Sequence, residues 1–417
     1  MNIFFSGIGG VGIGPLAEIS LDLGYGVQGS DQQASLLTEF LEERGVKISH
    51  NQDGSFLETC NLEAPLGWFV HTSALPNDHP ELAKARELGI KTAKRDELLA
   101  FILAEKNLKL IAIAGTHGKT TSTGMAIWAL QTLCVPISYS VGTTLSFGPS
   151  GKYHPESTFF IYECDEFDRN FLHFSPHLSL LISIDYDHAD TYPTKADYLA
   201  AFRTFAEQSG QVIMWSEDDK SIAPPTSHSW VLQPNEGMSF SIPGAHNRRN
   251  ATLVAKGIEC LTLGSTEQIR LAIDAFPGTS RRFERLAANL YSDYAHHPKE
   301  IAATLQLTHE LFNSIVVVYQ PHQNIRQYQV KGDYTDCFER AEEVYWLPTH
   351  LSREDPALPI LLPGELTVNI TNHSAIHIAD LNNDLWQAIE SARAHDKLVL
   401  IMGAGSIDAW IRQQLAV

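Results

Sequence analysis

The chain has few cysteines and few positive charges, and each shortage excludes a class of protein. Its five cysteines are scattered over 417 residues and lack metal-like spacing: Cys60, Cys134, Cys164, Cys260 and Cys337. They predict thiols in a reducing compartment rather than a disulfide framework. Lysine and arginine total 30 against 49 aspartate and glutamate residues, a formal net charge of -19. This excess of acid argues against a nucleic-acid partner, because basic patches carry that affinity.

Long apolar runs are also missing. Runs such as those at residues 178–184 and 315–319 have the length of a strand and are too short to cross a bilayer. The first residues lead directly into a glycine-rich turn, without the basic segment that opens a signal peptide. We therefore expect a soluble, cytoplasmic protein with no membrane partner, either a monomer or a weak homodimer. Its length exceeds that of one hydrophobic core and predicts two or three domains.

The centre of the chain carries a phosphate-binding pattern. An apolar run at 111–114 leads into Gly-Thr-His-Gly-Lys-Thr-Thr at 115–121, and a helix-compatible segment follows. The glycines let backbone N–H groups turn toward phosphate oxygens, Lys119 supplies a cation, and Thr120 offers a hydroxyl to Mg²⁺. The usual first glycine would fall on Ile113, so a tight strand–helix turn without a nucleotide is the alternative interpretation.

A second glycine-rich turn lies near the N-terminus. The pattern Gly-x-Gly-x-x-Gly at 7–12 separates a predicted strand at 2–6 from a helix at about 15–23, and Asp31 ends the next strand. This order is typical of a βαβ unit that binds a nucleotide. The alternatives are a turn needed only for packing, or an NAD(P)-dependent oxidoreductase. The oxidoreductase would leave the central phosphate loop without a purpose.

Acidic residues follow two further predicted strands. The strand at 159–163 runs into Glu163, Asp165 and Glu166, and the strand at 178–184 runs into Asp187 and His188. The carboxyl ends of parallel strands meet at one edge of a sheet, so these groups could hold a metal beside the phosphate loop. Chance clustering in turns is the alternative.

Strands and helices alternate along the rest of the chain. We expect further strands at 211–215, 287–293, 315–320, 343–347 and 398–402. The pattern predicts an α/β protein of three domains with mostly parallel sheets. These are a Rossmann-like N-terminal domain at 1–107, a central P-loop ATPase domain at 108–279 and a Rossmann-like C-terminal domain at 280–417.

Five stretches, in this order, resemble the motifs of the Mur ligases, the ATP-dependent amide-forming enzymes of peptidoglycan precursor synthesis. They are the phosphate loop, the acids at 163–166, Asp-His-Ala-Asp at 187–190, Gly-Ala-His-Asn-x-x-Asn-Ala at 244–251 and Asp-Tyr-Ala-His-His-Pro at 293–298. The glycine turn, Gly-Ser-Asp at 29–31, Gln-Pro-His at 320–322 and Gly-Ala-Gly at 403–405 are similar to the branch that adds L-alanine. The resemblance implies that ATP phosphorylates the lactyl carboxylate of UDP-N-acetylmuramate. The amine of the amino acid then attacks the acyl phosphate, and ADP and phosphate are released.

The resemblance also implies the residues of the site. ATP would be bound by Gly115, Thr116, His117, Gly118, Lys119, Thr120, Thr121, His246, Asn247, Asn250, Arg282 and Asp293. Mg²⁺ would be held by Thr120, Glu163 and His188, and the UDP-sugar by Gly9, Gly10, Val11, Gly12, Asp31 and Ser73. Lys119, His188, His296 and Arg326 would act in the chemistry, with Arg326 as a clamp for the amino-acid carboxylate. The asparagines at 247 and 250 could instead merely cap a helix.

Two positions depart from the resemblance. Gln323 stands where the alanine-adding branch has the first of two arginines, and Ser183 stands where the family often has asparagine. The incoming amine therefore stays open. One alternative is the branch that attaches a recycled L-Ala-γ-D-Glu-diaminopimelate tripeptide to the same sugar nucleotide. Others are a ligase of the folylpolyglutamate type, which lacks such a first domain, and a catalytically silent nucleotide-binding scaffold.

Overall fold

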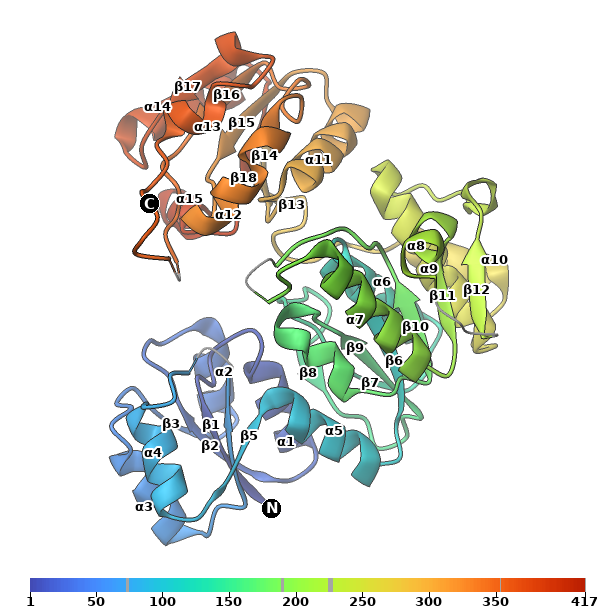
Figure 1. Cartoon of the computed structure of the whole chain (residues 1–417), viewed down its shortest axis with the longest axis vertical. Helices are drawn as coiled ribbons and strands as arrows, with labels where there is room; N and C mark the ends of the chain where they lie inside the picture. The colour runs from blue at the N-terminus through green and yellow to red at the C-terminus, as the bar shows by residue number, and fades with distance from the viewer. Residues whose placement is uncertain (73–74, 189–190, 224–227, 353, 417) are drawn as a thin grey trace. The chain divides into compact units, whose positions relative to one another are not determined.

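The computed structural model describes residues 1–72, 75–188, 191–223, 228–352 and 354–416 (Figure 1). They form two compact units, one of residues 1–240 and 250–277 and the other of residues 241–249 and 278–417. The chain is an α/β protein with three mostly parallel sheets, as the sequence predicts. Within the described ranges, no helix is long and apolar enough to cross a membrane.

The first sheet lies in the first unit and is parallel throughout, in the order β3-β2-β1-β4-β5. Its strands are β1 (Asn2–Ser6), β2 (Gly26–Ser30), β3 (Lys47–Ser49), β4 (Trp68–His71) and β5 (Lys91–Lys94). The strand order reverses at β1, which lies between β2 and β4. Open sheets of this kind bind ligands beside that point, at the carboxyl ends of the strands.

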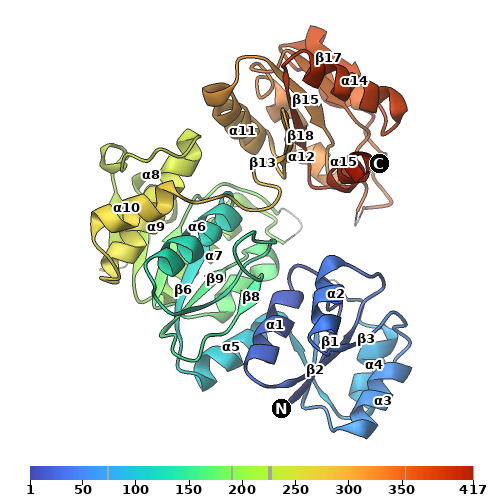
Figure 2. The same ribbon diagram turned by 180° about the vertical axis from the view of Figure 1, so that it is seen from behind.

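Helices cover both faces of the first sheet. They are α1 (Gly14–Asp22), α2 (Leu36–Glu43), α3 (Ser55–Glu63), α4 (Pro80–Glu87) and α5 (Arg95–Glu105). The helices α3 and α4 lie side by side (Figures 1 and 2), and Phe4 packs beneath them with Leu57. Ile3 and Phe5 join the core on the opposite face, with Leu16 of α1. This alternation follows from the two-residue period of a strand.

The second sheet has the order β12-β11-β10-β6-β9-β7-β8, with only the β7–β8 edge antiparallel. Its strands are β6 (Lys109–Ala114), β7 (Ile137–Ser140), β8 (Gly151–Lys152), β9 (Phe159–Glu163), β10 (Leu178–Leu181), β11 (Val212–Trp215) and β12 (Ser229–Leu232). Its helices are α6 (Lys119–Thr132), α7 (Lys195–Gln208), α8 (Ser216–Ile222), α9 (Ala245–Cys260) and α10 (Thr266–Asp274), with 3-10 turns η1 (Phe167–His173) and η2 (Pro234–Glu236). Because β6 lies between β10 and β9, the loops that follow these three strands meet at one edge.

The third sheet lies in the second unit, in the order β13-β14-β18-β15-β16-β17. Its strands are β13 (Glu284–Ala287), β14 (Leu290–Asp293), β15 (Ile315–Tyr319), β16 (Glu343–Trp346), β17 (Ile376–Ile378) and β18 (Leu398–Met402). The helices are α11 (Pro298–Leu311), α12 (Asn324–Val330), α13 (Pro363–Thr367), α14 (Asn383–Ala394) and α15 (Ile407–Ala416), with η3 (Lys331–Tyr334) and η4 (His373–Ala375). Val317 and Tyr319 enter the core on one face, and Val316 and Val318 enter the core on the other.

One predicted strand was wrong. The segment at 287–293 is not a single strand, because β13 ends at Ala287 and pairs antiparallel with β14. The chain turns at Asn289, which has a φ of 54°. Asparagine tolerates this left-handed conformation, and its presence was the local signal for the turn.

Candidate active site

The phosphate loop joins β6 to α6 and needs glycine at two positions. Gly115 and Gly118 have φ values of 138° and 81°. A Cβ built on Gly115 would lie 2.7 Å from the carbonyl oxygen of Ser183. Only glycine combines these backbone angles with so close an approach. The loop ends at Gly118, and Lys119 is the first residue of α6.

Lys119 is held by the loop and by one acid from the strand beside it. Its Nζ donates to the carbonyl oxygen of Gly115 at 2.7 Å and to Oε2 of Glu166 at 2.6 Å. Burial alone would lower the pKa of Lys119, but the carboxylates of Glu166 and Asp165 outweigh burial and raise it. Burial likewise opposes ionisation of Glu166, yet Lys119 and His188 lower its pKa. Both groups of the pair are therefore charged.

Thr120 and Glu163, both predicted to hold Mg²⁺, are in direct contact. The Thr120 hydroxyl donates to Oε1 of Glu163 at 2.7 Å, and the N–H of Gly142 donates to Oε2 at 3.0 Å. A hydroxyl and a carboxylate side by side form the oxygen-rich donor set that Mg²⁺ prefers.

His188 lies with Asp165 and Glu166, two of the acids that the sequence predicts beside the phosphate loop, although the resemblance implies only Glu163 among those acids as a metal ligand. One ligand atom from each of Asp165, Glu166 and His188 lies within 4.8 Å of the others. The Nε2 of His188 is 3.6 Å from Oε1 of Glu166, and its ring packs edge-on against Phe167. The signal in the sequence was the run of acids after β9. That run did not reveal which acid turns toward Lys119. The last acid of the 187–190 motif lies outside the described residues.

Thr116 and His117 join the loop to the end of β10. The Thr116 hydroxyl donates to the carbonyl oxygen of Asp185 at 2.7 Å, and the N–H of His117 donates to Oγ of Ser183 at 3.0 Å. The Nε2 of His117 is 3.5 Å from a carboxylate oxygen of Asp185. Ser183, the departure from the usual asparagine, thus contacts the phosphate loop itself. Thr121 lies in the first turn of α6 and is partly buried.

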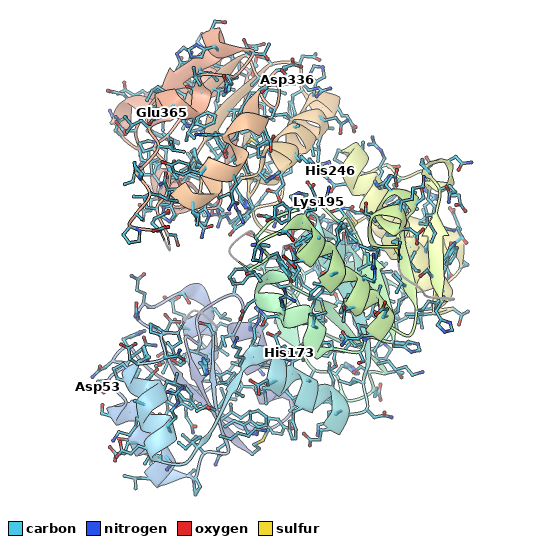
Figure 3. The ribbon with its side chains drawn as sticks, in the orientation of Figure 1. Asp53, His173, Lys195, His246, Asp336 and Glu365 are labelled. Carbon is cyan, nitrogen blue, oxygen red and sulfur yellow. The ribbon has the colours of Figure 1, made fainter. Side chains whose placement is uncertain are left out.

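The predicted adenine-contacting stretch forms the start of α9. His246, labelled in Figure 3, is partly buried, and desolvation of its ring lowers its pKa to about 4. The side-chain amide of Asn247 donates to the carbonyl oxygen of Pro243 at 3.0 Å, a local bond at the start of the helix. Asn250 lies against the phosphate loop, because a Cβ on Gly118 would be 2.5 Å from its Nδ2.

The predicted UDP-sugar residues gather at the carboxyl edge of the first sheet. The N–H of Gly9 donates to Oδ2 of Asp31 at 2.8 Å, and the N–H of Gly10 donates to the carbonyl oxygen of Gly7. Val11 is two-thirds exposed, and Gly12 follows it two residues before α1 begins at Gly14. Ser73 lies outside the described residues.

Two predicted ATP ligands belong to the third sheet. Asp293 is buried at the end of β14, where its two oxygens accept the N–H groups of Phe283 and Ala295, each at 2.8 Å. Burial raises the pKa of Asp293. The Arg282 guanidinium lies over the ring of Tyr294, 5.0 Å from its centroid. Asp293 therefore also fixes the backbone at Phe283, the residue next to Arg282.

The predicted amino-acid residues lie together at the edge of the third sheet. A guanidinium nitrogen of Arg326 contacts Nε2 of His296, whose Nδ1 is 3.4 Å from a carboxylate oxygen of Glu300. Two further imidazoles, His322 and His350, stack at 5.6 Å, and burial lowers the pKa of His322 to about 3. Sequence reasoning missed His350, which no motif marks.

Gln323, the second departure, begins the turn into α12. It has a φ of 61°, and its N–H donates to the carbonyl oxygen of His350 at 2.9 Å. The side chain at 323 is neutral, so of the two arginines that the resemblance leads one to expect here the chain has only Arg326.

Comparisons with known proteins cover nearly the whole chain. The family models described as "Mur ligase family, catalytic domain", "Mur ligase middle domain" and "Mur ligase, glutamate ligase domain" match residues 2–107, 113–233 and 281–405. A UDP-N-acetylmuramate–L-alanine ligase of Clostridium botulinum is 31% identical, over 97% of this chain and 95% of the relative. One from Nocardioides sp. is 30% identical, over 98% and 94%.

Solved structures share the fold. The UDP-N-acetylmuramate-alanine ligase of Thermotoga maritima superposes with a TM-score of 0.78 at 23% identity, covering 100% of this chain and 98% of that one. A murein peptide ligase of Psychrobacter arcticus has a TM-score of 0.66 at 20% identity, with the same coverage. Three matching family models in order, and 31% identity over almost the full length, lead to one conclusion: the chain belongs to the Mur ligase family.

Proposed function

We propose that the chain is an ATP-dependent ligase that forms an amide bond between L-alanine and the lactyl carboxylate of UDP-N-acetylmuramate. The observation that carries the proposal is the match, over nearly the full length of both chains, to proteins named UDP-N-acetylmuramate–L-alanine ligases. The phosphate loop, with Lys119 and Thr120 at the start of α6, supports ATP as the second substrate.

The proposed reaction proceeds through an acyl phosphate. A carboxylate is a poor electrophile, so its oxygen first takes the γ-phosphoryl group of ATP, and ADP leaves. The neutral amine then attacks the carbonyl carbon, and the tetrahedral intermediate collapses with loss of phosphate and a proton. The first step brings two anions together, which calls for fixed positive charge more than for covalent help from the protein. Lys119, charged and held by Gly115 and Glu166, supplies that charge.

The residues around the loop fit Mg²⁺. The paired oxygens of Thr120 and Glu163 form one candidate donor set, and Asp165, Glu166 and His188 form a second. These are hard oxygen donors and one imidazole, without a thiol among them. Bound Mg²⁺ would offset the charge of the phosphate oxygens.

We assign the remaining roles by domain. Residues 1–107 would bind the UDP-sugar, through Gly9, Gly10, Val11, Gly12, Asp31 and Ser73. Residues 108–279 would bind ATP, through the phosphate loop, His246, Asn247 and Asn250. Residues 280–417 would contribute Arg282 and Asp293 to ATP binding, and His296 and Arg326 to the amino acid.

A second candidate is attachment of the L-Ala-γ-D-Glu-diaminopimelate tripeptide to the same sugar nucleotide. The specific observation in its favour is Gln323, because a site that binds the carboxylate of a free amino acid gains from a second arginine. The murein peptide ligase of Psychrobacter arcticus supports the shared fold and not this choice, because its identity is 20%.

The test is phosphate release from ATP in the presence of UDP-N-acetylmuramate and a panel of amines. The panel holds L-alanine, glycine, L-serine and the tripeptide. Release with L-alanine as the best substrate supports the first proposal, and release with the tripeptide alone supports the second. Both proposals are contradicted if the chain is folded, as judged by circular dichroism, and none of the four amines produces phosphate release.

A further inference from the structure

Arg95 lies at the carboxyl edge of the first sheet and has no part in the roles assigned above. It is the first residue of α5 and directly follows β5. Its guanidinium rests on the glycine turn at 7–12, because a Cβ built on Gly12 would lie 2.6 Å from its Nη1. The absence of a side chain at residue 12 is what lets the guanidinium approach the backbone there.

The partners of Arg95 orient its guanidinium and leave its terminal nitrogens available. Its Nε donates to Oδ2 of Asp96 at 3.4 Å, and Asp96 is itself buried and accepts a 2.7 Å bond from the Tyr162 hydroxyl. An oxygen of Asp165 is 3.9 Å from Nη2, beyond hydrogen-bond distance. Within the described ranges, neither terminal nitrogen of Arg95 donates a hydrogen bond. The side chain is 26% exposed, so a ligand can reach it.

Two backbone donors lie in the turn that Arg95 contacts. The N–H of Gly10 is used within the turn, and the N–H of Gly14 bonds to the carbonyl oxygen of Gly10. The N–H groups of Val11 and Gly12, between them, donate to no acceptor in the part of the chain that the structure describes. The turn then enters α1, whose N-terminal end adds a favourable dipole for an anion.

The geometry points to Arg95 as the side chain that binds the diphosphate of the sugar nucleotide, together with the N–H groups of Val11 and Gly12. This inference rests on the proposed function, which supplies the sugar nucleotide as the ligand. A guanidinium fork matches pairs of phosphate oxygens, and the two N–H groups beside it supply donors for the remaining oxygens. Asp96 and Tyr162 would then act as positioning residues, since they fix the guanidinium and do not touch the ligand.

The lactyl carboxylate is the other anion of this substrate that Arg95 could bind. Binding by three ligands to the full chain separates the two groups. UDP carries only the diphosphate, UDP-N-acetylglucosamine adds a sugar without the lactyl group, and UDP-N-acetylmuramate carries both anions. Titration calorimetry on the unmodified chain, Arg95→Ala and Arg95→Lys compares them.

We expect Arg95→Ala to weaken binding of all three ligands by about 10- to 100-fold, since a charge-assisted pair is lost. Arg95→Lys should recover only part of this loss, because an ammonium lacks the fork. The control is Arg86→Ala. Arg86 is exposed at the end of α4 and donates to the carbonyl oxygen of Asn77, so its loss should leave all three affinities unchanged.

Gly12→Ala tests the position of the Arg95 guanidinium without removing it, and it keeps the backbone N–H of residue 12. The new methyl group would displace Nη1, yet it meets only the far end of a flexible side chain, so this variant keeps the fold and should still lose affinity for UDP. Unchanged UDP affinity in Arg95→Ala overturns the inference, as does a loss confined to UDP-N-acetylmuramate. Failure of the unmodified chain to bind any of the three overturns the proposed function as well.

Discussion

The ammonium of Lys119 lies 2.6 Å from a carboxylate oxygen of Glu166, and the Glu166 side chain is completely buried. The phosphate-loop cation is therefore fixed by an acid that follows the neighbouring strand β9. The other oxygen of the same acid faces His188 at 3.6 Å. The Glu166 carboxylate therefore contacts both Lys119, which is proposed to bind ATP, and His188, which is proposed to bind a metal.

Replacing Lys119 should remove turnover and spare the first domain. In Lys119→Ala, the repulsion between ATP and the substrate carboxylate is no longer offset, and phosphate release should fall to the background rate. UDP should bind as it does to the unmodified chain, because its proposed residues lie at the first sheet. Phosphate release and UDP titration are measured on the same preparation. Comparable turnover in the variant would refute the role of this lysine.

Replacing Glu166 should raise the Mg²⁺ requirement. Glu166→Gln removes the charge that faces Lys119 and His188, so we expect the Mg²⁺ concentration for half-maximal phosphate release to rise about 10- to 100-fold. The matched control is Asp168→Asn, in the same loop, whose carboxylate is exposed and pairs with Lys94. A Mg²⁺ titration that is the same for both variants would remove Glu166 from the metal site.

Glu18 should make stability fall as the pH rises. Burial raises the pKa of Glu18 to about 7 from its ordinary 4.5, although the N–H of Gly151 donates to it at 2.7 Å. Between these two pH values the folded chain holds a proton that the unfolded chain has lost, so the free energy of unfolding decreases across this window.

Glu18→Gln keeps an acceptor for Gly151 and removes the titration. Relative to the unmodified chain, the variant should gain about 1–3 kcal/mol between pH 5 and pH 8, measured by urea unfolding at both values. Glu43→Gln, at an exposed carboxylate on α2, should leave the pH dependence unchanged. If Glu18→Gln and Glu43→Gln behave alike, the titration of Glu18 does not govern stability.

Arg326 should determine affinity for the amine substrate. In Arg326→Ala the amino-acid carboxylate loses its charge partner beside His296, and we expect KM for the preferred amine to rise about 100-fold while KM for ATP changes little. Arg285→Ala removes an exposed arginine on β13 of the same sheet and serves as the control. An equal rise in both KM values would place Arg326 outside the amine site.

The sequence predicted the fold because two periodic signals agree along the chain. Apolar strands of the expected length alternate with helices, and the glycine turns follow β1 and β6 as they do in nucleotide-binding sheets. The strands β3, β7, β8 and β17 were not predicted, because each is short and none carries a long apolar run.

Only the site residues that lie within sequence motifs could be predicted. The phosphate loop was visible because its spacing is set by backbone contact with phosphate. Arg95 was not predicted as a site residue, and Glu166 was predicted only as one of several acids near the loop, since the contact that fixes each side chain is made by folding. For Arg95 that contact is with Gly12, 83 positions earlier in the chain, and for Glu166 it is with Lys119, on a different strand–loop unit.

The proposed reaction converts the sugar-nucleotide carboxylate into an acyl phosphate. Its most direct test uses UDP-N-acetylmuramate with ¹⁸O in the lactyl carboxylate, together with ATP, Mg²⁺ and L-alanine. Mass spectrometry of the products should show the alanyl amide with one ¹⁸O retained and the other ¹⁸O in the released phosphate. An amide that forms while the phosphate stays unlabelled, or ATP hydrolysis without any amide, would contradict the acyl-phosphate reaction.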